Sequence, residues 1–183
     1  MSYIVVCADV GSVRRGKFQW ASSLQGEGNC GGSPSSLAEF VAARLLERKR
    51  VALGFECPLS VPVPSDEMQL GGGRNGEGNR PWSAGAGCGA LATGLVQVTW
   101  VLTEVLKIVG GASKKISLPS VVGEFERVPG PALFVWESFV TSTAKGENDR
   151  EDAQIGVEAY IAARSIRAES SVNCAGHPLS LAG

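Results

Sequence analysis

The sequence predicts an α/β protein with a mixed sheet, an N-terminal antiparallel hairpin and flanking helices. Three short, nearly continuous apolar runs, at 3–9, 51–56 and 132–137, are typical of strands that are buried on both faces. Amphipathic stretches between and after these runs predict helices that cover the sheet. Because 183 residues correspond to about one domain of ordinary size, we expect a single domain over 1–183 with a Gly-rich loop at 65–89.

The N-terminal part of the chain predicts a strand, a turn and a second strand. The run from Tyr3 to Asp9 predicts the first buried strand, and 11–16 predicts the turn that follows it. Residues 17–21 alternate between polar and apolar, which is typical of a half-exposed antiparallel strand. We expect residues 26–32 to form a loop.

A helix is predicted after Ser33-Pro34. The pattern Ser36-x-x-Glu39 resembles a capping box, which is typical of a helix start. The helix is expected to end in the basic cluster 48–50, which is favourable at a helix C-terminus. Its predicted buried face consists of Leu37, Phe40, Val41 and Leu45.

The rest of the chain predicts two more strands and two more helices. Strands are expected at 51–56 and 132–137, and a long amphipathic helix is expected at 91–109. The final helix is predicted over 151–168, with an inward face made of Ile155, Ala159, Ala163 and Ile166.

Composition excludes several classes of protein. Seventeen basic and eighteen acidic residues leave a net charge of −1, so binding of nucleic acid through bulk charge is excluded, although a local basic patch is not. One histidine and five scattered cysteines without a C-x-x-C pair exclude a zinc cluster.

The two most apolar segments do not predict a membrane partner. The N-terminal apolar run is too short for a signal peptide, and polar and charged residues interrupt the stretch 95–109. We therefore expect a cytoplasmic protein with reduced thiols, and the sequence does not indicate its oligomeric state.

Acidic residues close all three predicted buried strands. These residues are Asp9, Glu56 and Glu137, and parallel strands would bring them to the same edge of the sheet. Asp149 and Asp152, at the start of the last helix, could supply a fourth acid. Oxygen ligands without histidine or cysteine favour Mg²⁺ or Mn²⁺, and two such ions can activate water and stabilise the leaving oxygen in phosphodiester cleavage. Acids of this kind can also be solvated residues at the start of loops, and this alternative stays open.

Several short motifs in order resemble a known family. They are Cys7-Ala8-Asp9-Val10-Gly11-Ser12, Phe55-Glu56-Cys57-Pro58-Leu59, Arg80-Pro81-Trp82, Trp136-Glu137-Ser138 and Asp152-Ala153. Together they resemble a family of predicted RNase H-like nucleases, domain-of-unknown-function family 429, over most of the chain.

This resemblance implies an RNase H-like fold and a set of site residues. It implies that Asp9, Glu56, Glu137 and Asp152 are the metal ligands and catalytic residues. The chain departs from related resolvases, in which a histidine often precedes the last acid, because the segment at 145–149 contains none.

Candidate substrate-binding residues lie near the predicted acidic site. Arg74, Arg80 and Trp82 follow Glu56 and could hold phosphate, stack on a base or pin the loop, and Lys145 could neutralise phosphate charge. We therefore predict a divalent-metal-dependent nuclease or phosphodiesterase, with a nucleic acid or another phosphoester as substrate. The alternatives are a catalytically inactive nucleotide- or nucleic-acid-binding module on the same fold, and a structural subunit.

Overall fold

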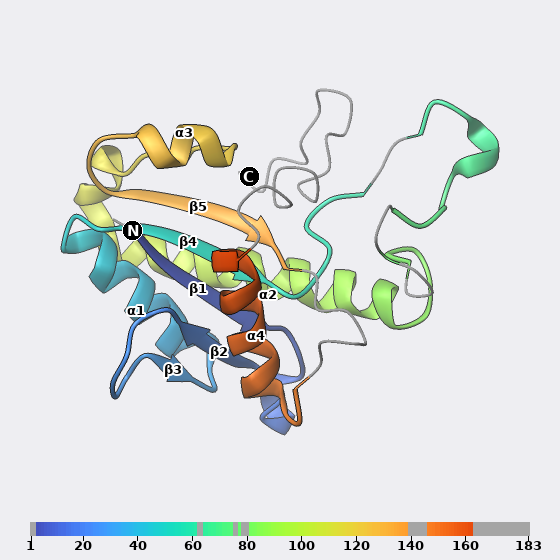
Figure 1. Cartoon of the computed structure of the whole chain (residues 1–183), viewed down its shortest axis with the longest axis horizontal. Coiled ribbons are helices and arrows are strands. Elements are labelled where there is room, and N and C mark those ends of the chain that lie inside the picture. The colour runs from blue at the N-terminus through green and yellow to red at the C-terminus, as the bar shows by residue number, and fades with distance from the viewer. Residues whose placement is uncertain (1–2, 62–63, 75–76, 78–80, 139–145, 163–183) are drawn as a thin grey trace.

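The structure is a computed structural model that describes residues 3–61, 64–74, 77, 81–138 and 146–162. Its strands are β1 (Tyr3–Asp9), β2 (Gln19–Ser22), β3 (Cys30–Gly31), β4 (Arg50–Phe55) and β5 (Ala132–Glu137). They form one mixed sheet in the order β3-β2-β1-β4-β5 (Figure 1). The α/β class and the three predicted buried strands are confirmed, with β4 beginning and ending one residue earlier than expected.

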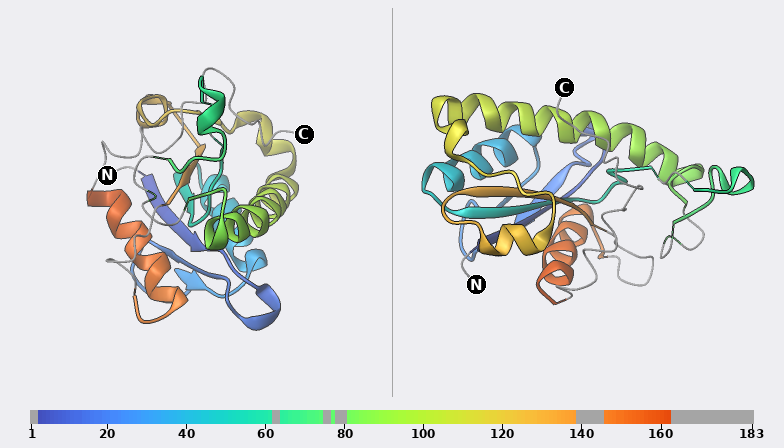
Figure 2. Two further views of the ribbon diagram at one scale, coloured as in Figure 1. Left: turned by 90° about the vertical axis from the view of Figure 1, so that its right-hand side faces the viewer. Right: turned by 90° about the horizontal axis from the view of Figure 1, so that it is seen from above.

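Two pairs of helices cover the two faces of this sheet. The helices are α1 (Pro34–Leu46), α2 (Gly85–Val109), α3 (Val122–Arg127) and α4 (Asp149–Ala162). Short 3-10 helices are formed by Val13–Arg15, Glu67–Gln69 and Gly110–Lys115. Figure 2 shows α1 and α2 on one side of the sheet and α3 and α4 on the other.

The direction of the strands brings three of their C-terminal ends to one edge. Strand β1 pairs antiparallel with β2, as the predicted hairpin requires, and parallel with β4, which in turn pairs parallel with β5. The Glu56 amide continues the ladder beyond β4 and donates to the carbonyl of Ala8 at 2.8 Å. The ends of β1, β4 and β5 are therefore neighbours, which is where the acidic residues were expected.

Alternate residues of the central strands pack into two separate cores. Val6 and Leu53 face α1 and α2, whereas Val5 and Ala52 face α3 and α4. Side chains on successive residues of a strand point to opposite faces, so a sheet covered twice needs an apolar residue at nearly every position. This double burial explains the continuous apolar runs.

The second strand of the hairpin alternates as predicted at first and is then buried on both faces. Phe18 and Trp20 are buried while Lys17 is exposed and Gln19 is half-buried, but the expected half-exposure is wrong at Ala21, which is 3% exposed. Helix α4 contacts β2 as well as β1 and covers the face that was expected to meet solvent. The expected loop at 26–32 is also wrong in part, because Cys30–Gly31 pairs with β2 as strand β3.

Helix α1 begins directly after Ser33, as Ser33-Pro34 predicted, but its cap is not Ser36, and it ends at Leu46, before the basic cluster 48–50 that was expected to close it. Ser33 is the N-cap, and its hydroxyl accepts the Ser36 amide at 3.1 Å. The hydroxyl of Ser36 accepts instead from the Trp20 indole at 3.0 Å, which ties the helix to β2. Of the predicted inward residues, Leu37, Val41 and Leu45 are buried, while Phe40 packs partly buried against the core.

Helix α2 is longer than predicted and includes the end of the Gly-rich segment. It begins at Gly85, so residues 85–89 of the expected loop are helical. At Gly94 a β-carbon would lie 2.3 Å from the Cys57 sulfur, so glycine permits the close approach of this helix to the chain after β4.

The segment Gly85–Ala112 is long and apolar enough to cross a membrane, with a mean hydropathy of 1.4 and 22% of its most apolar window buried. Core helices of soluble proteins share this length and composition, so the segment is weak support for a membrane span. The expected absence of a membrane partner and the cytoplasmic location stay predictions.

Helix α4 buries a different face from the one predicted. Its inward residues are Asp152, Ala153, Gly156, Val157 and Tyr160. Ile155 is only half-buried, Ala159 is exposed, and the other two predicted inward positions, Ala163 and Ile166, lie outside the described residues. The inward face contains a carboxylate and a glycine, so a search for apolar periodicity selects the wrong stripe.

Candidate metal centre

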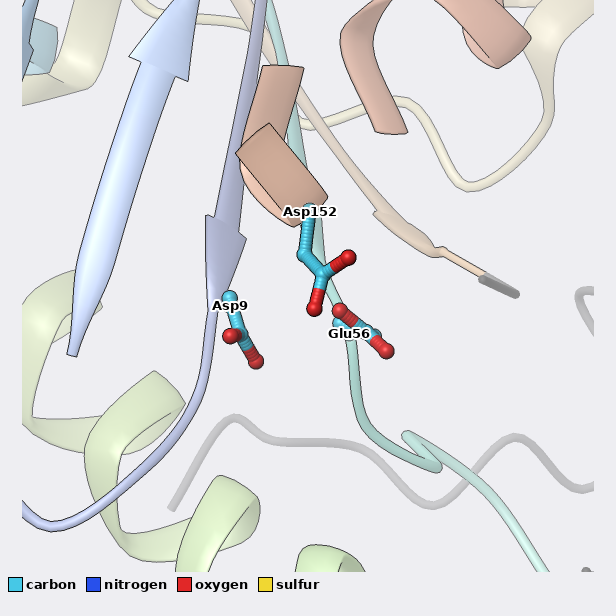
Figure 3. Close-up of side chains that lie close together, drawn as sticks. All are labelled: Asp9, Glu56 and Asp152. Atoms are coloured by element: carbon cyan, nitrogen blue, oxygen red, sulfur yellow. The ribbon is translucent and has the colours of Figure 1, made fainter. Parts of the chain in front are cut away.

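Three carboxylates from distant parts of the chain converge at the edge of the sheet. Asp9, Glu56 and Asp152 each offer one oxygen, and these oxygens all lie within 4.8 Å of one another. We call this group the acidic triad. Figure 3 shows the three side chains pointing toward one another from the end of β1, the segment after β4 and the first turn of α4. The structure thus brings together three of the four acids that the sequence analysis selected.

The parallel register of β1 and β4 places the first two acids side by side. Ala8 is paired with Phe55, so Asp9 and Glu56 are the next residues of two adjacent strands. Adjacent strands lie about 4.8 Å apart, which is within the reach of two carboxylate side chains that leave the sheet at the same edge. Both residues are half-buried.

The third acid is held by the local structure at the start of α4. The Asn148 side-chain oxygen accepts the amides of Arg150 and Glu151 at 3.1 Å each, and Glu151 accepts in return from the Glu147 amide at 2.7 Å. This reciprocal capping fixes the first turn. Asp152 follows it, is 5% exposed, and accepts the Gly146 amide on Oδ1 at 2.7 Å. The pattern Asn148-x-x-Glu151 is the sequence signal that locates this helix start.

A glycine one turn later allows α4 to approach β1 closely. A β-carbon on Gly156 would lie 2.4 Å from the Cys7 sulfur and 3.0 Å from the Ser138 hydroxyl. Distances this short are sterically forbidden, so only glycine permits the observed packing. The approach carries Asp152, four residues earlier on the same face of the helix, to the ends of β1 and β4.

The thiol nearest this packing contact does not compete as a ligand. The pKa of Cys7 is raised to about 12, mainly by burial; the hydrogen bond to Ser138 opposes this rise, and the charges of Glu56 and Asp9 add to it. Metal ligation requires the thiolate, so a thiol with this pKa stays protonated near neutral pH. The candidate ligands at this edge are therefore the carboxylate oxygens.

The fourth predicted acid, Glu137, is not part of the acidic triad, which corrects the expected meeting of all three strand ends. Its carboxylate forms a two-pronged bond with Arg74, with Nη1 donating to Oε2 at 2.9 Å and Nη2 to Oε1 at 2.5 Å. It also accepts the Leu59 amide at 3.0 Å. The position at the end of β5 was predicted, but the arginine that binds this carboxylate was not assigned to it.

A second carboxylate shares the same arginine. Arg74 Nε donates to Glu77 Oε1 at 2.7 Å, and Glu77 Oε2 accepts the amides of Arg74 and Trp82 at 2.7 and 3.2 Å. The three charged side chains, Arg74, Glu77 and Glu137, are between 3% and 5% exposed. Burial raises the pKa of Glu137, and the hydrogen bonds from Arg74 and the Leu59 amide lower it only in part, while the charge of Glu77 adds a small further rise.

The two predicted substrate-binding residues that the structure describes bind other groups of the protein. Arg74 is engaged in the buried ionic cluster, and Trp82 donates its indole N–H to the Gly72 carbonyl at 3.0 Å. Both contacts hold the Gly-rich segment in place, which is one of the three roles that the sequence left open for these residues. Arg80 and Lys145 lie outside the described residues.

Basic residues that the sequence analysis did not select lie in the turn that follows Asp9. Lys17 forms an ion pair with Asp149 at 3.1 Å, so Asp149 faces the hairpin while Asp152 faces the triad. Arg14 and Arg15 occupy the exposed turn between β1 and β2. The pattern Arg14-Arg15-x-Lys17, which begins only five residues after Asp9, is the signal that could have identified them.

Comparisons of the chain with protein-family models, with curated proteins and with solved structures found no significant match. The resemblance to RNase H-like nucleases therefore stays a prediction, and the functional argument rests on the geometry of the site.

Proposed function

We propose that this protein is a divalent-metal-dependent phosphodiester hydrolase with an RNase H-like fold. The observation that carries the proposal is the convergence of Asp9, Glu56 and Asp152, whose oxygens lie within 4.8 Å of one another. Three carboxylates in so small a volume repel one another unless a cation or a proton compensates their charge. Such an arrangement is typical of a site for a hard cation.

The residues present fit a small divalent ion. Two ligand oxygens of one octahedral Mg²⁺ lie about 2.9–4.2 Å apart. The three oxygens of the triad, all within 4.8 Å of one another, need only a small adjustment to reach these distances. The donors are carboxylate oxygens, so the site favours Mg²⁺ or Mn²⁺ over softer metals. An ion bound there would supply Lewis-acid activation of water and neutralisation of phosphate charge.

The chain itself supplies a rigid frame for this chemistry. Asp9 and Glu56 are fixed by the β1–β4 ladder, and Asp152 is oriented by the Gly146 amide. Ligands held by regular elements need little rearrangement when the ion and a phosphate bind.

The architecture supports the RNase H-like part of the proposal. A mixed sheet with an N-terminal antiparallel hairpin and flanking helices is what the resemblance implied. The engagement of Glu137 by Arg74 departs from the implied set of four acids, so the proposal assigns the ion to three of them.

Thermal unfolding with a chelator and with Mn²⁺ tests the metal site. The wild-type protein should gain stability from Mn²⁺, by about 2.7 kcal/mol at about 100 times the dissociation constant. Asp9→Asn should be at least as stable as wild type without metal, because it removes one repelling charge, and should lose most of the gain with Mn²⁺. The matched control is Glu39→Gln, an exposed acid on α1, which should respond to Mn²⁺ like wild type.

The same proteins, incubated with labelled oligonucleotides and Mn²⁺, test the activity. Cleavage by wild type and Glu39→Gln but not by Asp9→Asn supports the proposed function. A metal-dependent shift without cleavage favours the inactive binding module. A wild-type midpoint that does not move with metal contradicts the metal site and the hydrolase assignment together.

A further inference from the structure

The turn between β1 and β2 carries a cluster of exposed positive charges close in sequence to Asp9 of the acidic triad. It contains Arg14, Arg15 and Lys17, all exposed, and it follows directly from Asp9. Lys17 is paired with Asp149, whereas neither Arg14 nor Arg15 forms an ion pair with any other residue that the structure describes. We call residues 12–17 the basic hairpin.

The basic hairpin is an ordered element. The Ser12 carbonyl accepts the amides of Arg15 and Lys17 at 3.0 Å each, and Gly16 closes the turn with a φ of 67°. At its base, Gln97 of α2 donates to the Gly11 carbonyl at 2.6 Å. The Lys17–Asp149 pair connects it to the first turn of α4, which also carries Asp152. The two arginines are therefore held at a defined place relative to the triad.

From this placement we propose that the basic hairpin binds the phosphate backbone of a nucleic acid whose reacting phosphate lies at the acidic triad. The inference rests on the proposed function and narrows its substrate to nucleic acid. Arg14 follows Asp9 by five residues, so their α-carbons lie at most about 18 Å apart. Because backbone phosphates advance about 3.4 Å per nucleotide along a duplex axis, this corresponds to about five nucleotides.

The chemistry of the hairpin favours a polyanion over a small phosphoester. Arginine binds phosphate oxygens with paired N–H groups and keeps its charge at any physiological pH. A strand with a phosphate at every nucleotide can contact the triad and the hairpin together at any separation up to this limit of about 18 Å, whereas a small phosphoester offers no such series of phosphates. The net charge of −1 means that affinity for such a strand must come from a local patch of this kind.

Binding of a fluorescent oligonucleotide of about 20 nucleotides, measured by anisotropy in EDTA as salt is raised, tests the proposal. The double variant Arg14→Ala/Arg15→Ala should bind on the order of tenfold more weakly than wild type. The slope of log affinity against log salt should also become shallower, by about 0.7 per lost contact for a single strand and about 0.9 for duplex DNA.

The matched control is Lys49→Ala/Arg127→Ala, which changes the net charge equally at two exposed positions near the opposite ends of the strands. It should bind oligonucleotide like wild type. Equal losses in both double variants, an unchanged Arg14→Ala/Arg15→Ala variant, or wild-type binding to phosphatidylserine vesicles but not to oligonucleotide would each overturn the proposal.

Metal-dependent melting separates this inference from the proposed function. Arg14→Ala/Arg15→Ala should keep the Mn²⁺-dependent shift of wild type, because neither arginine belongs to the triad. Oligonucleotide binding that depends on the hairpin, in a wild-type protein that shows no Mn²⁺ shift, would contradict the hydrolase and leave the binding surface standing. A Mn²⁺-dependent shift without hairpin-dependent binding would contradict the binding surface and leave the metal site standing.

Discussion

Arg74 is the cation that compensates the charge of two buried carboxylates. It donates to both Glu137 and Glu77, and all three side chains are almost completely shielded from water. Removing the guanidinium would leave two buried carboxylates without their cation, whereas removing one carboxylate would leave a matched pair. The two kinds of substitution should therefore differ strongly in their cost.

We expect Arg74→Met to lower the free energy of unfolding by about 3–5 kcal/mol, as measured by urea denaturation. Glu137→Gln should cost clearly less, because Arg74 keeps Glu77. Hydrogen exchange at the Trp82 amide, which donates to Glu77, should be faster in Arg74→Met. The control is Arg127→Met at an exposed position, with an effect within about 0.5 kcal/mol. Equal costs for Arg74→Met and Arg127→Met would contradict the buried cluster.

At the scale of elements, the position of α4 decides whether a site exists. Strands β1 and β4 bring Asp9 and Glu56 together by themselves, but Asp152 reaches them only because Gly156 lets the helix lie against Cys7. Packing in such contacts tolerates little added volume. A single methyl group at this position should therefore change both stability and the geometry of the triad.

We expect Gly156→Ala to destabilise the fold by about 1–3 kcal/mol through overpacking and to weaken the Mn²⁺-dependent shift in thermal midpoint. Gly89→Ala is the matched control, because Gly89 also lies in a helix but a β-carbon there meets nothing within 4 Å. That variant should be more stable than wild type by up to about 1 kcal/mol and should keep the full shift. A Gly156→Ala protein with an unchanged metal response would show that α4 does not position Asp152.

For the whole molecule, a net charge of −1 is the sum of local groups of like charge. Carboxylates concentrate at the acidic triad and in the buried ionic cluster, and the basic hairpin carries positive charge at the same end of β1. Stability should therefore depend on pH through particular buried groups more than through the overall charge.

Glu137 allows the sign of one such dependence to be derived. Burial raises its pKa above the usual value of 4.5, so between 4.5 and the higher value the folded protein binds more protons than the unfolded chain. The stability of wild type relative to Glu137→Gln should therefore fall as pH rises above 4.5 and level off above the raised pKa. Urea denaturation of both proteins across that range measures the difference. A relative stability that increases with pH would mean that Arg74 lowers this pKa below 4.5.

Patterns of burial explain how much of this structure could be predicted from the sequence. Strands buried on both faces leave continuous apolar runs, so β1, β4 and β5 and the acids that follow them could be found. Strand β2 could not be found as a buried strand, because its covering helix is contributed by a segment more than a hundred residues away. The inward face of α4 was missed because it is built on Asp152 and Gly156, which apolar periodicity ignores.

The candidate site, too, could be predicted from the sequence only in part. Position at a strand end was enough to select Asp9 and Glu56, and position in a first helical turn selected Asp152. What position could not show is which acid has a partner, because Arg74 reaches Glu137 from a Gly-rich segment that has no periodic pattern. The basic hairpin was missed because its residues were interpreted as a turn and a strand.

The order in which the three acids of the triad occur along the chain has a consequence for synthesis. Residues 9 and 56 leave the ribosome early, whereas Asp152 follows only after the whole sheet has been made, at about 5–20 residues per second. The β1–β4 pair can form before then, but it holds two of the three oxygens. The contact between Asp9 and Asp152 closes one of the longest loops in the protein, which favours its formation late in folding. Nascent chains that have not yet docked α4 would thus lack the complete acidic triad, so the proposed activity would begin only when the fold is finished.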